Sequence, residues 1–594
     1  LLLFIVGSFA IGFILGGRDP GVRSVMGLGT AQRNVSAALV VSAQNFAGTQ
    51  TLPFVLVGAI LLLLVLLPTA KQLGARVKAP APAKPFSEAI TAPVYAEYLK
   101  TLASDEFEGR GPGSIGERAT VAYLEDQFKQ LGLQPGNGDS WVQTVPMVET
   151  RADPKTTLAL SVKGQPQTLA FGEQMVVGTR TTKPEVKLEN APLVFAGYGV
   201  NAPEAGWNDY EGLDVKGKVV VVLINDPGFI RKDPGLFKGL TMTYYGRWTY
   251  KFEEAARQGA AGVLIVHETE AAAYGWDVVR NGWTGPQFDL PPEEDAEPRV
   301  PIQGWITSEV ATKLFADAGL DFEALRQAAD QRGFKAVPLD ATLSVDLKST
   351  VRRATSDNVL ALLPGTTRKD ETVVYMGHWD HLGRSFGSPD GDNIYNGAID
   401  NATGVAGALA IAKAFTQQQP APERSVLFLI PTLEESGLLG SRYYANHPVR
   451  PLEQTVAVIN MDALPAQGRA RDMGVVGRGQ SELEDLLADV VAVQGRVIGP
   501  EESPEKGYYF RSDHFNFARV GVPALYAKGG NDLVEGGVEA GMAAANDFTT
   551  NRYHKTGDEF DPAWNLEGTV QDIDALYEVG RRIAAGDSWP QWKP

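Results

Sequence analysis

From residue 355 onward, the chain alternates short apolar segments with segments of helical periodicity, and this alternation restricts the folds open to it. The segments are TVVYMG (372–377), GVAGALAIAKAF (404–415), RSVLFLIP (424–431) and TVAVINM (455–461). A strand that is apolar on both faces must be covered on both faces, as happens when helices flank a sheet. We therefore predict an α/β domain over residues 351–594, with a central mixed sheet flanked by helices.

The sequence before this domain has different patterns of apolar and turn-forming residues. Residues 91–153 hold a Gly-rich loop and a helical pattern over 115–131, and we expect them to be the N-terminal part of the same domain. Residues 154–350 are rich in strands and turns, with one amphipathic helix over 249–259, and we interpret them as an insertion. A Pro/Ala-rich linker precedes both parts, over residues 79–90. A length of 594 residues accommodates three or more such units.

The first 78 residues differ from the rest in charge and in hydropathy. Residues 1–87 contain seven basic residues and one acidic residue, a net charge of +6. The whole chain has a net charge of −17, so the residues after Ser87 carry −23. Two apolar runs, at 1–17 and 52–68, would each be about 25 Å long as helices, which predicts transmembrane helices that anchor the protein. A cleaved signal peptide at the second run is the alternative, although no short basic leader precedes it.

The polar stretch between the two runs contains the motif GTAQRN (29–34). With its flanks, over residues 1–75, it resembles the C-terminal end of the bile acid:sodium symporter family, in which this motif lies on a broken helix. Most of a transporter is missing, so we expect an anchor without transport activity. The basic residues after the second run favour the cytoplasm for the downstream part of the chain, whereas those after the first run favour the opposite side. We expect a membrane-anchored protein whose main part is periplasmic or extracellular.

The composition excludes several classes of function. The chain has no cysteine, which rules out disulfides, thiolate metal sites, iron–sulfur clusters and a thiol nucleophile. Its acidic balance, 71 Asp and Glu against 54 Lys and Arg, argues against nucleic acid as a partner, because such binding needs a basic surface.

Histidines and carboxylates follow the apolar strands at the points where those strands end. They lie in HWDH after 377, AIDN before 402, LEES after 432, MDAL after 460 and the loop RYHK at 552–555; the candidate residues are His378, Asp380, Asp400, Glu434, Glu435, Asp462, Tyr553 and His554. Ligands of α/β sheets bind beyond the carboxyl ends of the strands. Imidazoles and carboxylates without thiolates suit Zn²⁺ or another borderline divalent ion, and five such ligands are enough for two ions that share one carboxylate.

Two pairs of neighbouring residues suggest distinct roles within this set. His378 and Asp380 are two positions apart in extended backbone, so Asp380 can accept the second ring N–H of His378. Glu434 and Glu435 are adjacent carboxylates that point in different directions. One of them can bind a metal while the other stays free as a general base.

Other candidate motifs are assigned no catalytic chemistry. We interpret His267 as structural, His381 and His447 as loop residues, and leave open a role for His514 in a substrate pocket. The sequence GRSFG (383–387) fits the G-x-S-x-G pattern of serine hydrolases, but the flanking residues are typical of loops and not of a strand–turn–helix.

The order H-x-D, D-N, E-E, D, Y-H over residues 355–560 resembles the dizinc aminopeptidases of metallopeptidase family 28. The helix and GRGPGS loop at 105–135 resemble the usual N-terminal portion of that family. The insertion resembles a protease-associated (PA) domain, on the motifs VFAGYGV, WNDYEGLDVKGKVVVV and YKFEEAARQGAAGVLIVH.

The resemblance implies a role for each of the matching residues. His378 and Asp462 would bind one zinc ion, Glu435 and His554 the other, and Asp400 would bridge both. Glu434 would be the general base, Asp380 would orient His378, and Tyr553 would donate a hydrogen bond to the oxyanion. The resemblance also implies a non-proline cis peptide bond between Asp400 and Asn401.

These expectations predict a zinc-dependent aminopeptidase that carries two Zn²⁺ ions per chain and removes N-terminal residues from peptides with a free N-terminus. A carboxypeptidase on the same scaffold is an alternative, for which Arg511 could face the substrate carboxylate. A second alternative is a membrane-anchored binding ectodomain without catalytic activity, although such proteins typically lose metal-binding residues. A glutaminyl cyclase-like transferase uses a single zinc ion, which the five intact ligands argue against.

Overall fold

The computed structural model describes residues 10, 11, 13–15, 23, 26, 60, 84–385, 391–501 and 503–593. The chain forms two units, Leu1–Pro82 and Ala83–Pro594, and the second is described below. The predicted apolar runs at 1–17 and 52–68 lie almost wholly outside the described residues, so the membrane anchor stays a prediction. Among the residues that are described, no helix is both long and apolar enough to cross a bilayer.

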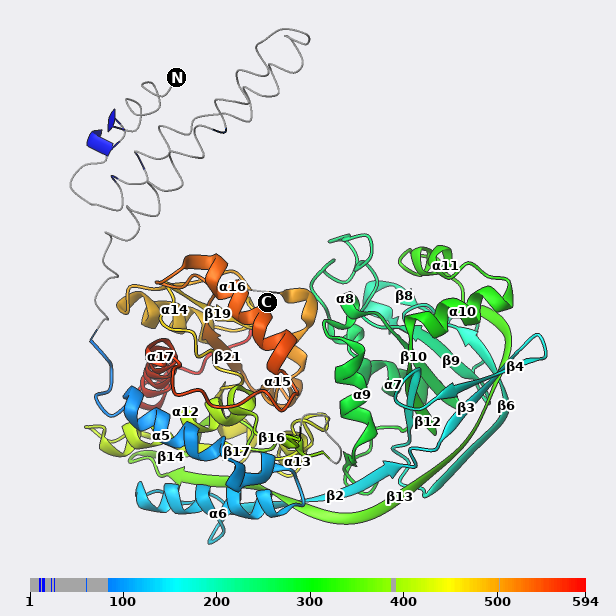
Figure 1. The fold of residues 1–594 in the computed structure, drawn as a ribbon. Coiled ribbons are helices and arrows are strands. Elements are labelled where there is room, and N and C mark those ends of the chain that lie inside the picture. Colours follow the sequence, from blue (N-terminus) through cyan, green and yellow to red (C-terminus); the bar gives the residue numbers. More distant parts are fainter. Residues whose placement is uncertain are drawn as a thin grey trace. The chain divides into compact units, whose positions relative to one another are not determined.

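A parallel sheet forms the centre of the α/β domain (Figure 1). Its strands lie side by side in the order β17 (Arg424–Ile430), β14 (Arg368–Met376), β18 (Thr455–Asn460) and β21 (Ala524–Gly529). β19 (Asp472–Val475) extends the sheet antiparallel to β21 and pairs with the short β20 (Val497–Ile498). Every residue of β17 and β18 is buried, which confirms the prediction from their apolar sequences.

Helices cover both faces of this sheet. On one face α5 (Ala92–Leu102), α12 (Thr403–Gln417), α14 (Leu483–Val493) and α17 (Glu567–Ala585) enclose the largest core. On the other face α13 (Leu439–Asn446) and α15 (His514–Arg519) cover a smaller core, in which Tyr444 and Phe517 pack on Val374 and Val458. Burial on both sides explains why the central residues of these strands are apolar.

The N-terminal part of the domain contains α6 (Ile115–Gln130), as predicted. The Ser114 side chain accepts a hydrogen bond from the Glu117 backbone N–H, which caps the helix, and Gly132 follows its end with a φ of 84°. The turn η1 (Asp105–Arg110) precedes α6, and β1 (Gln134–Pro135) pairs with β13 after it.

Two long strands connect this domain to the insertion. β13 (Val337–Leu363) pairs with β17 at its C-terminal end, with β2 (Val142–Ala152) along its middle, and with the insertion sheet at its N-terminal end. Figure 1 shows β2 and β13 running from one lobe to the other. The predicted boundary at 350/351 therefore falls inside a continuous strand, whereas that at 153/154 coincides with the end of β2.

The insertion has its own mixed sheet, and its helix content corrects the sequence prediction. The strand order is β4 (Gln165–Ala170), β3 (Thr157–Val162), β13, β6 (Glu185–Phe195), β9 (Val219–Leu223), β10 (Gly262–His267), β12 (Ile302–Thr307) and β5 (Met175–Gly178). β6, β9, β10 and β12 are mutually parallel, so the connections between them must cross over one face of the sheet.

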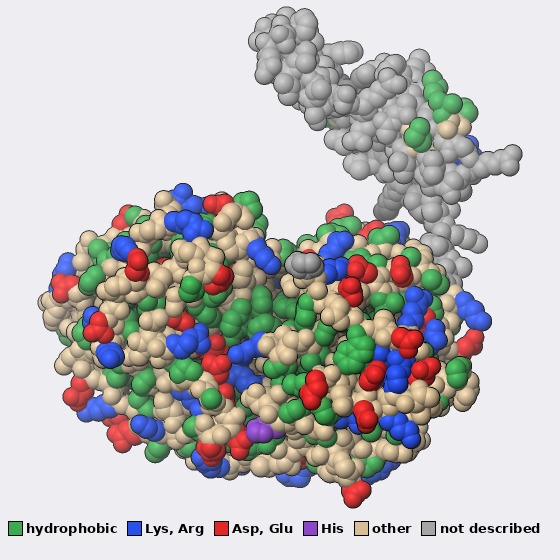
Figure 2. All heavy atoms as spheres, turned by 180° about the vertical axis from the view of Figure 1, so that it is seen from behind, with side chains coloured by type: hydrophobic (Ala, Val, Ile, Leu, Met, Phe, Trp, Pro, Cys, Tyr) green, Lys and Arg blue, Asp and Glu red, His purple; other side chains and the backbone are tan. Residues whose placement is uncertain are grey.

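The connections between the strands contain helices that the sequence pattern did not indicate. The predicted amphipathic helix is α7 (Trp248–Arg257), but α8 (Thr269–Ala272), α9 (Trp276–Thr284), α10 (Ser308–Ala318) and α11 (Phe322–Ala329) accompany it. The short β7 (Asn201–Ala202), β8 (Trp207–Asn208) and β11 (Gln287–Asp289) complete the region, with β11 paired to β2. On the face in Figure 2, acidic and basic side chains of the described residues are interspersed.

Candidate metal centre

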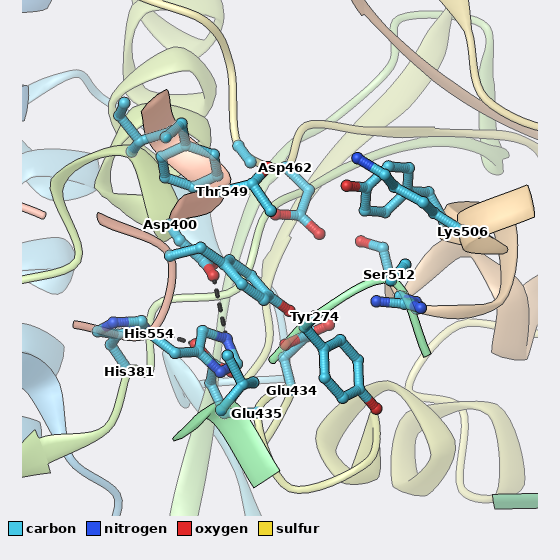
Figure 3. A pocket seen from close by; sticks show the side chains of 18 of the residues that line it. Tyr274, His381, Asp400, Glu434, Glu435, Asp462, Lys506, Ser512, Thr549 and His554 are labelled. Carbon is cyan, nitrogen blue, oxygen red and sulfur yellow. Dashed lines mark hydrogen bonds and ion pairs between the residues drawn. The ribbon is translucent and has the colours of Figure 1, made fainter. Parts of the chain in front are cut away.

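The predicted histidines and carboxylates converge at the carboxyl ends of β14, β17 and β18. His378 follows β14 after one glycine, the Glu434–Glu435 pair follows β17, and Asp462 follows β18. Asp400 lies in the turn η4 (Ala398–Ala402) that opens α12, and His554 follows the turn η8 (Phe548–Arg552). Figure 3 shows Asp400, Glu434, Glu435, Asp462 and His554 around one space. Motifs that are far apart in the sequence thus form one cluster, because parallel strands end at the same edge of the sheet.

His378 directs its second ring nitrogen, Nε2, at three carboxylates. Its Nδ1 lies 3.1 Å from the backbone carbonyl oxygen of Asp380, and a carbonyl can only accept, so Nδ1 carries the proton of the neutral ring. Its Nε2 is buried and lies 3.4 Å from Asp400, 3.5 Å from Asp462 and 3.8 Å from Glu434. In the part of the chain that the structure describes, this nitrogen has no hydrogen-bond partner. This is the tautomer and the orientation of a metal-binding imidazole.

Asp400 lies between the two predicted centres. Its Oδ1 is 3.4 Å from His378 Nε2 and its Oδ2 is 3.4 Å from His554 Nε2, so each oxygen faces a different imidazole. Buried Asp558 holds this turn in place, because its carboxylate accepts the backbone N–H groups of Ile399 and Asp400 at 3.1 and 3.0 Å. The expected cis peptide bond between Asp400 and Asn401 is present.

The adjacent glutamates have opposite electrostatic environments. Burial raises the pKa of Glu434 well above its ordinary value; His378 opposes this increase and the negative charge of Glu435 adds to it. Burial also acts to raise the pKa of Glu435, but His554, at 2.9 Å, and His381 outweigh it and lower that pKa to about 2. Glu434 is therefore the readier proton acceptor and Glu435 the permanent anion.

Asp380 is placed differently from its predicted role. Its carboxylate lies 3.8 Å from His378 Nδ1, and it accepts the backbone N–H groups of Glu434 and Glu435 at 3.0 and 3.4 Å. The backbone carbonyl of Asp380, and not its carboxylate, orients His378. The side chain of Asp380 therefore fixes the glutamate pair.

The sequence interpretation missed His381. This side chain is buried, its Nδ1 lies 2.5 Å from Glu435 Oε1, and no described residue makes a hydrogen bond with its Nε2. Two groups of three side chains have ligand atoms within 4.8 Å of one another: His378, Glu434 and Asp462 in one, His381, Asp400 and Glu435 in the other. The H-x-D-H spacing was the available signal, and only the path of the loop brings His381 to Glu435.

Arg110, in the Gly-rich loop before α6, was also missed. It is buried, and its guanidinium donates to the carbonyl oxygens of Trp379 at 2.8 Å, Asn396 at 2.5 Å and Gly397 at 2.9 Å. One cation thus holds together the loop of His378 and the loop that leads into Asp400.

The other sequence candidates lie outside the cluster. His267 ends β10 and contacts the Tyr274 carbonyl at 3.0 Å, in line with a structural role, while His447 lies at the end of α13, 3.2 Å from Glu294. His514 is buried against Tyr509 and Tyr526 and is absent from the pocket wall. Gly383 and Arg384 form the small strand β15 (Gly383–Arg384), paired antiparallel with β16 (Ile394–Tyr395), so the start of the serine-hydrolase pattern does not follow a strand of the central sheet.

A cavity of about 750 Å³ opens onto the cluster and extends beneath the insertion. Its wall includes Tyr244, Arg247 and Tyr274 of the insertion together with Tyr553 and Arg511 of the α/β domain. Tyr553 stacks on His554, with ring centroids 4.0 Å apart. The insertion therefore forms one wall of the candidate site.

The donor set fits divalent metal ions. Buried carboxylates lie within 4 Å of two imidazoles, and the one ring nitrogen of His378 able to act as a ligand has no hydrogen-bond partner among the described residues. Buried carboxylates repel one another unless a cation lies among them. Nitrogen and oxygen donors without sulfur suit zinc and similar ions.

The chain is similar to known peptidases in sequence and in fold. Residues 358–577 match the family model of peptidase family M28. An aminopeptidase from Aneurinibacillus sp. strain AM-1 has a similar fold, with a TM-score of 0.51 and 20% identity over 85% of this chain and 97% of that one. A vacuolar membrane protease of Lodderomyces elongisporus is 30% identical over 121 residues, 20% of this chain and 11% of that protein. Aminopeptidase NAALADL1 of Mus musculus is 28% identical over 158 residues, 25% of this chain and 20% of that protein.

Fold and site together define an α/β domain of the metallohydrolase class, with its cluster at the carboxyl ends of parallel strands. Residues 358–577 of the chain are similar to peptidase family M28. It spans about a tenth to a fifth of the length of the curated relatives named above.

Proposed function

We propose that the protein is a zinc-dependent aminopeptidase that binds two zinc ions per chain. His378 and Asp462 would hold one ion, Glu435 and His554 the other, and Asp400 both. The observation that carries the proposal is the position of Asp400, whose two oxygens each lie 3.4 Å from a different imidazole. When bound, the ions would polarise the scissile carbonyl and acidify a water molecule between them.

The chain's own groups would supply the proton transfers. Glu434, whose pKa is raised by burial, would accept the proton of the attacking water and return it to the departing amine. Tyr553, half-buried in the pocket wall and stacked on His554, would donate a hydrogen bond to the developing oxyanion. The carboxylates would also attract the free α-amine of the substrate, which favours peptides with an unblocked N-terminus.

Two measurements on the purified protein test this function. We expect about two zinc ions per chain by elemental analysis and hydrolysis of aminoacyl-p-nitroanilides, which a chelator abolishes and added zinc restores. Hydrolysis only of N-blocked peptides would favour the carboxypeptidase alternative, for which Arg511 lies in the pocket wall. Zinc binding without hydrolysis of any peptide would favour a non-enzymatic ectodomain.

Substitution of His381 should weaken zinc binding more than catalysis at saturating zinc. His381 contacts Glu435, so His381→Ala leaves that proposed ligand free to turn. Loss of such an orienting contact lowers metal affinity by about 10- to 100-fold. Zinc competition with a chromophoric chelator measures the change, and His447→Ala, a half-exposed histidine outside the cluster, is the matched control. Equal zinc affinity in His381→Ala and in the unmodified protein would exclude this role.

The insertion, which we propose to be a PA domain, should be dispensable for zinc binding and required for selectivity. Ala152 of β2 and Ser349 of β13 are register partners, so an Asn-Gly turn can join them and delete residues 153–348. We expect this variant to keep both zinc ions, since every proposed ligand lies outside the insertion, and to lose discrimination among peptides because one pocket wall is gone. Loss of zinc from a folded deletion variant would contradict the proposal.

We propose that residues 1–78 anchor the protein in a membrane and place the catalytic part on the periplasmic or extracellular side. The linker after them separates the anchor from the folded unit, so removal of residues 1–78 should leave kcat unchanged and abolish binding to vesicles. The activity of the truncated and full chains on the same nitroanilide measures this. A folded truncation without activity would show that the segment shapes the site.

A further inference from the structure

An ion pair joins the insertion to the loop that carries two residues of the proposed site. Asp277 lies in the first turn of α9, and Lys555 follows Tyr553 and His554 in the loop after η8. The Lys555 Nζ atom lies 3.0 Å from Asp277 Oδ2. Partial burial acts to raise the pKa of Asp277, but the contact with Lys555 outweighs it and lowers that pKa. Asp277 is therefore an anion at neutral pH.

The same lysine closes the turn on which Tyr553 lies. Its Nζ atom donates a hydrogen bond to the Thr550 carbonyl at 2.6 Å, and its backbone N–H donates to the Arg552 carbonyl at 2.9 Å. The backbone N–H of Tyr553 donates to the Phe548 carbonyl at 2.8 Å. Lys555 thus connects this turn of the α/β domain to a helix of the insertion.

The two site residues on the turn are held in different ways. His554 has a φ of 55°, which is uncommon for residues other than glycine, and its ring lies 2.9 Å from Glu435 and 3.4 Å from Asp400. The Tyr553 ring stacks on His554 at 4.0 Å between centroids and meets the Phe548 ring edge-on at 5.9 Å. The carboxylates therefore fix His554 directly, whereas the position of the Tyr553 hydroxyl group depends on the shape of the turn.

The ion pair lies outside the cavity that opens onto the metal cluster. Neither Asp277 nor Lys555 is part of the wall of that cavity. Both line a second hollow of about 570 Å³, which shares Tyr274 and Thr549 with the wall of the first. The pair can therefore influence a reaction at the cluster only through the loop that it holds.

We propose that Asp277 and Lys555 are positioning residues that hold the Tyr553 hydroxyl group in place for the oxyanion. This inference rests on the proposed peptidase function and deepens it, because it gives the insertion a part in the rate of the reaction. A hydrogen bond made only in the transition state raises kcat and kcat/KM equally. Loss of the pair should therefore lower kcat, leave KM unchanged and leave two zinc ions bound.

Substitution of either partner measures the contribution of the pair. The zinc-loaded full chain and its variants are assayed with an aminoacyl-p-nitroanilide. In Asp277→Asn and Lys555→Met we expect kcat to fall by about 2- to 5-fold, the range for an ion pair between half-exposed side chains. Asp277→Lys should lower kcat by about 10-fold, because repulsion is added to the lost attraction. Lys555→Arg retains the charge and should keep most of kcat.

A second ion pair between the insertion and the α/β domain provides the matched control. Glu297 of the insertion lies 3.0 Å from Arg519 at the end of α15. This pair also joins the two parts of the molecule, but it does not contact the loop of Tyr553. Glu297→Gln should therefore leave kcat unchanged.

Substitution of Tyr553 shows whether the ion pair acts through its hydroxyl group. Tyr553→Phe should by itself lower kcat by about 10²- to 10³-fold, the value of one oxyanion donor. In that background Asp277→Lys should have no further effect on kcat, because no hydroxyl group is left to position. A purely structural role would lower kcat equally in both backgrounds. Circular dichroism and zinc content show whether each variant is folded, and Lys555→Met replaces Asp277→Lys if the latter does not fold.

The outcomes distinguish this inference from the proposed function. Unchanged kcat in Asp277→Lys and Lys555→Met, or an equal loss with and without the Tyr553 hydroxyl group, would overturn the positioning role while the peptidase function stands. Normal kcat in Tyr553→Phe, or loss of zinc together with kcat in Asp277→Lys, would overturn it as well. A full chain that hydrolyses no aminoacyl-nitroanilide would overturn the proposed function, and the positioning role with it.

Discussion

Glu434→Gln is expected to reduce kcat by about 10²- to 10⁴-fold while two zinc ions stay bound, whereas Glu435→Gln should lose zinc and rate together. The neighbours differ because Glu435 lies 2.9 Å from His554 and beside His381, where a negative charge is needed. Glu434 has the raised pKa of a proton acceptor. Glutamine preserves size and polarity in both variants, so charge and basicity alone change.

Zinc per chain and kcat are measured for both purified variants, and each variant serves as the control for the other. Two bound zinc ions and near-normal turnover in Glu434→Gln would end the assignment of Glu434 as general base. Zinc loss in Glu434→Gln with retention in Glu435→Gln would exchange the two roles, an arrangement suggested by the grouping of Glu434 with His378 and Asp462.

Asp400→Asn should affect both centres at once. Its two carboxylate oxygens lie at 3.4 Å from His378 and from His554, and an amide offers one oxygen acceptor and one N–H₂ donor in their place. We expect zinc content to fall from two ions to one or fewer, and kcat to fall at least as far as in Glu434→Gln. Elemental analysis and nitroanilide hydrolysis measure both quantities.

The control for Asp400→Asn must separate a lost ligand from a disturbed turn. Asp558→Asn provides this control, because Asp558 holds the Asp400 turn through backbone N–H groups and not through His378 or His554. It should lower the thermal midpoint more than the zinc content. Two tightly bound zinc ions in a folded Asp400→Asn variant would refute the bridging position.

Much of the fold was predictable because the patterns that encode it are local. The apolar segments 424–430 and 455–460 became fully buried strands, and the periodicity at 115–131 became α6. The insertion was predicted less well, since α9, α10 and α11 lie between strands that dominate the hydropathy pattern. Its boundary at 350/351 was hidden for a related reason: β13 continues unbroken through both sheets.

The chain's sequence by itself determined the kinds of ligand available and their order at successive strand ends, because residue type and strand periodicity are local properties. The tertiary structure alone decided which side chains support them. His381 contacts Glu435 across 54 residues, Asp558 holds Asp400 across 158, and Arg110 contacts the Trp379 carbonyl across 269. Such contacts depend on sheet register and on the paths of loops, neither of which leaves a local pattern.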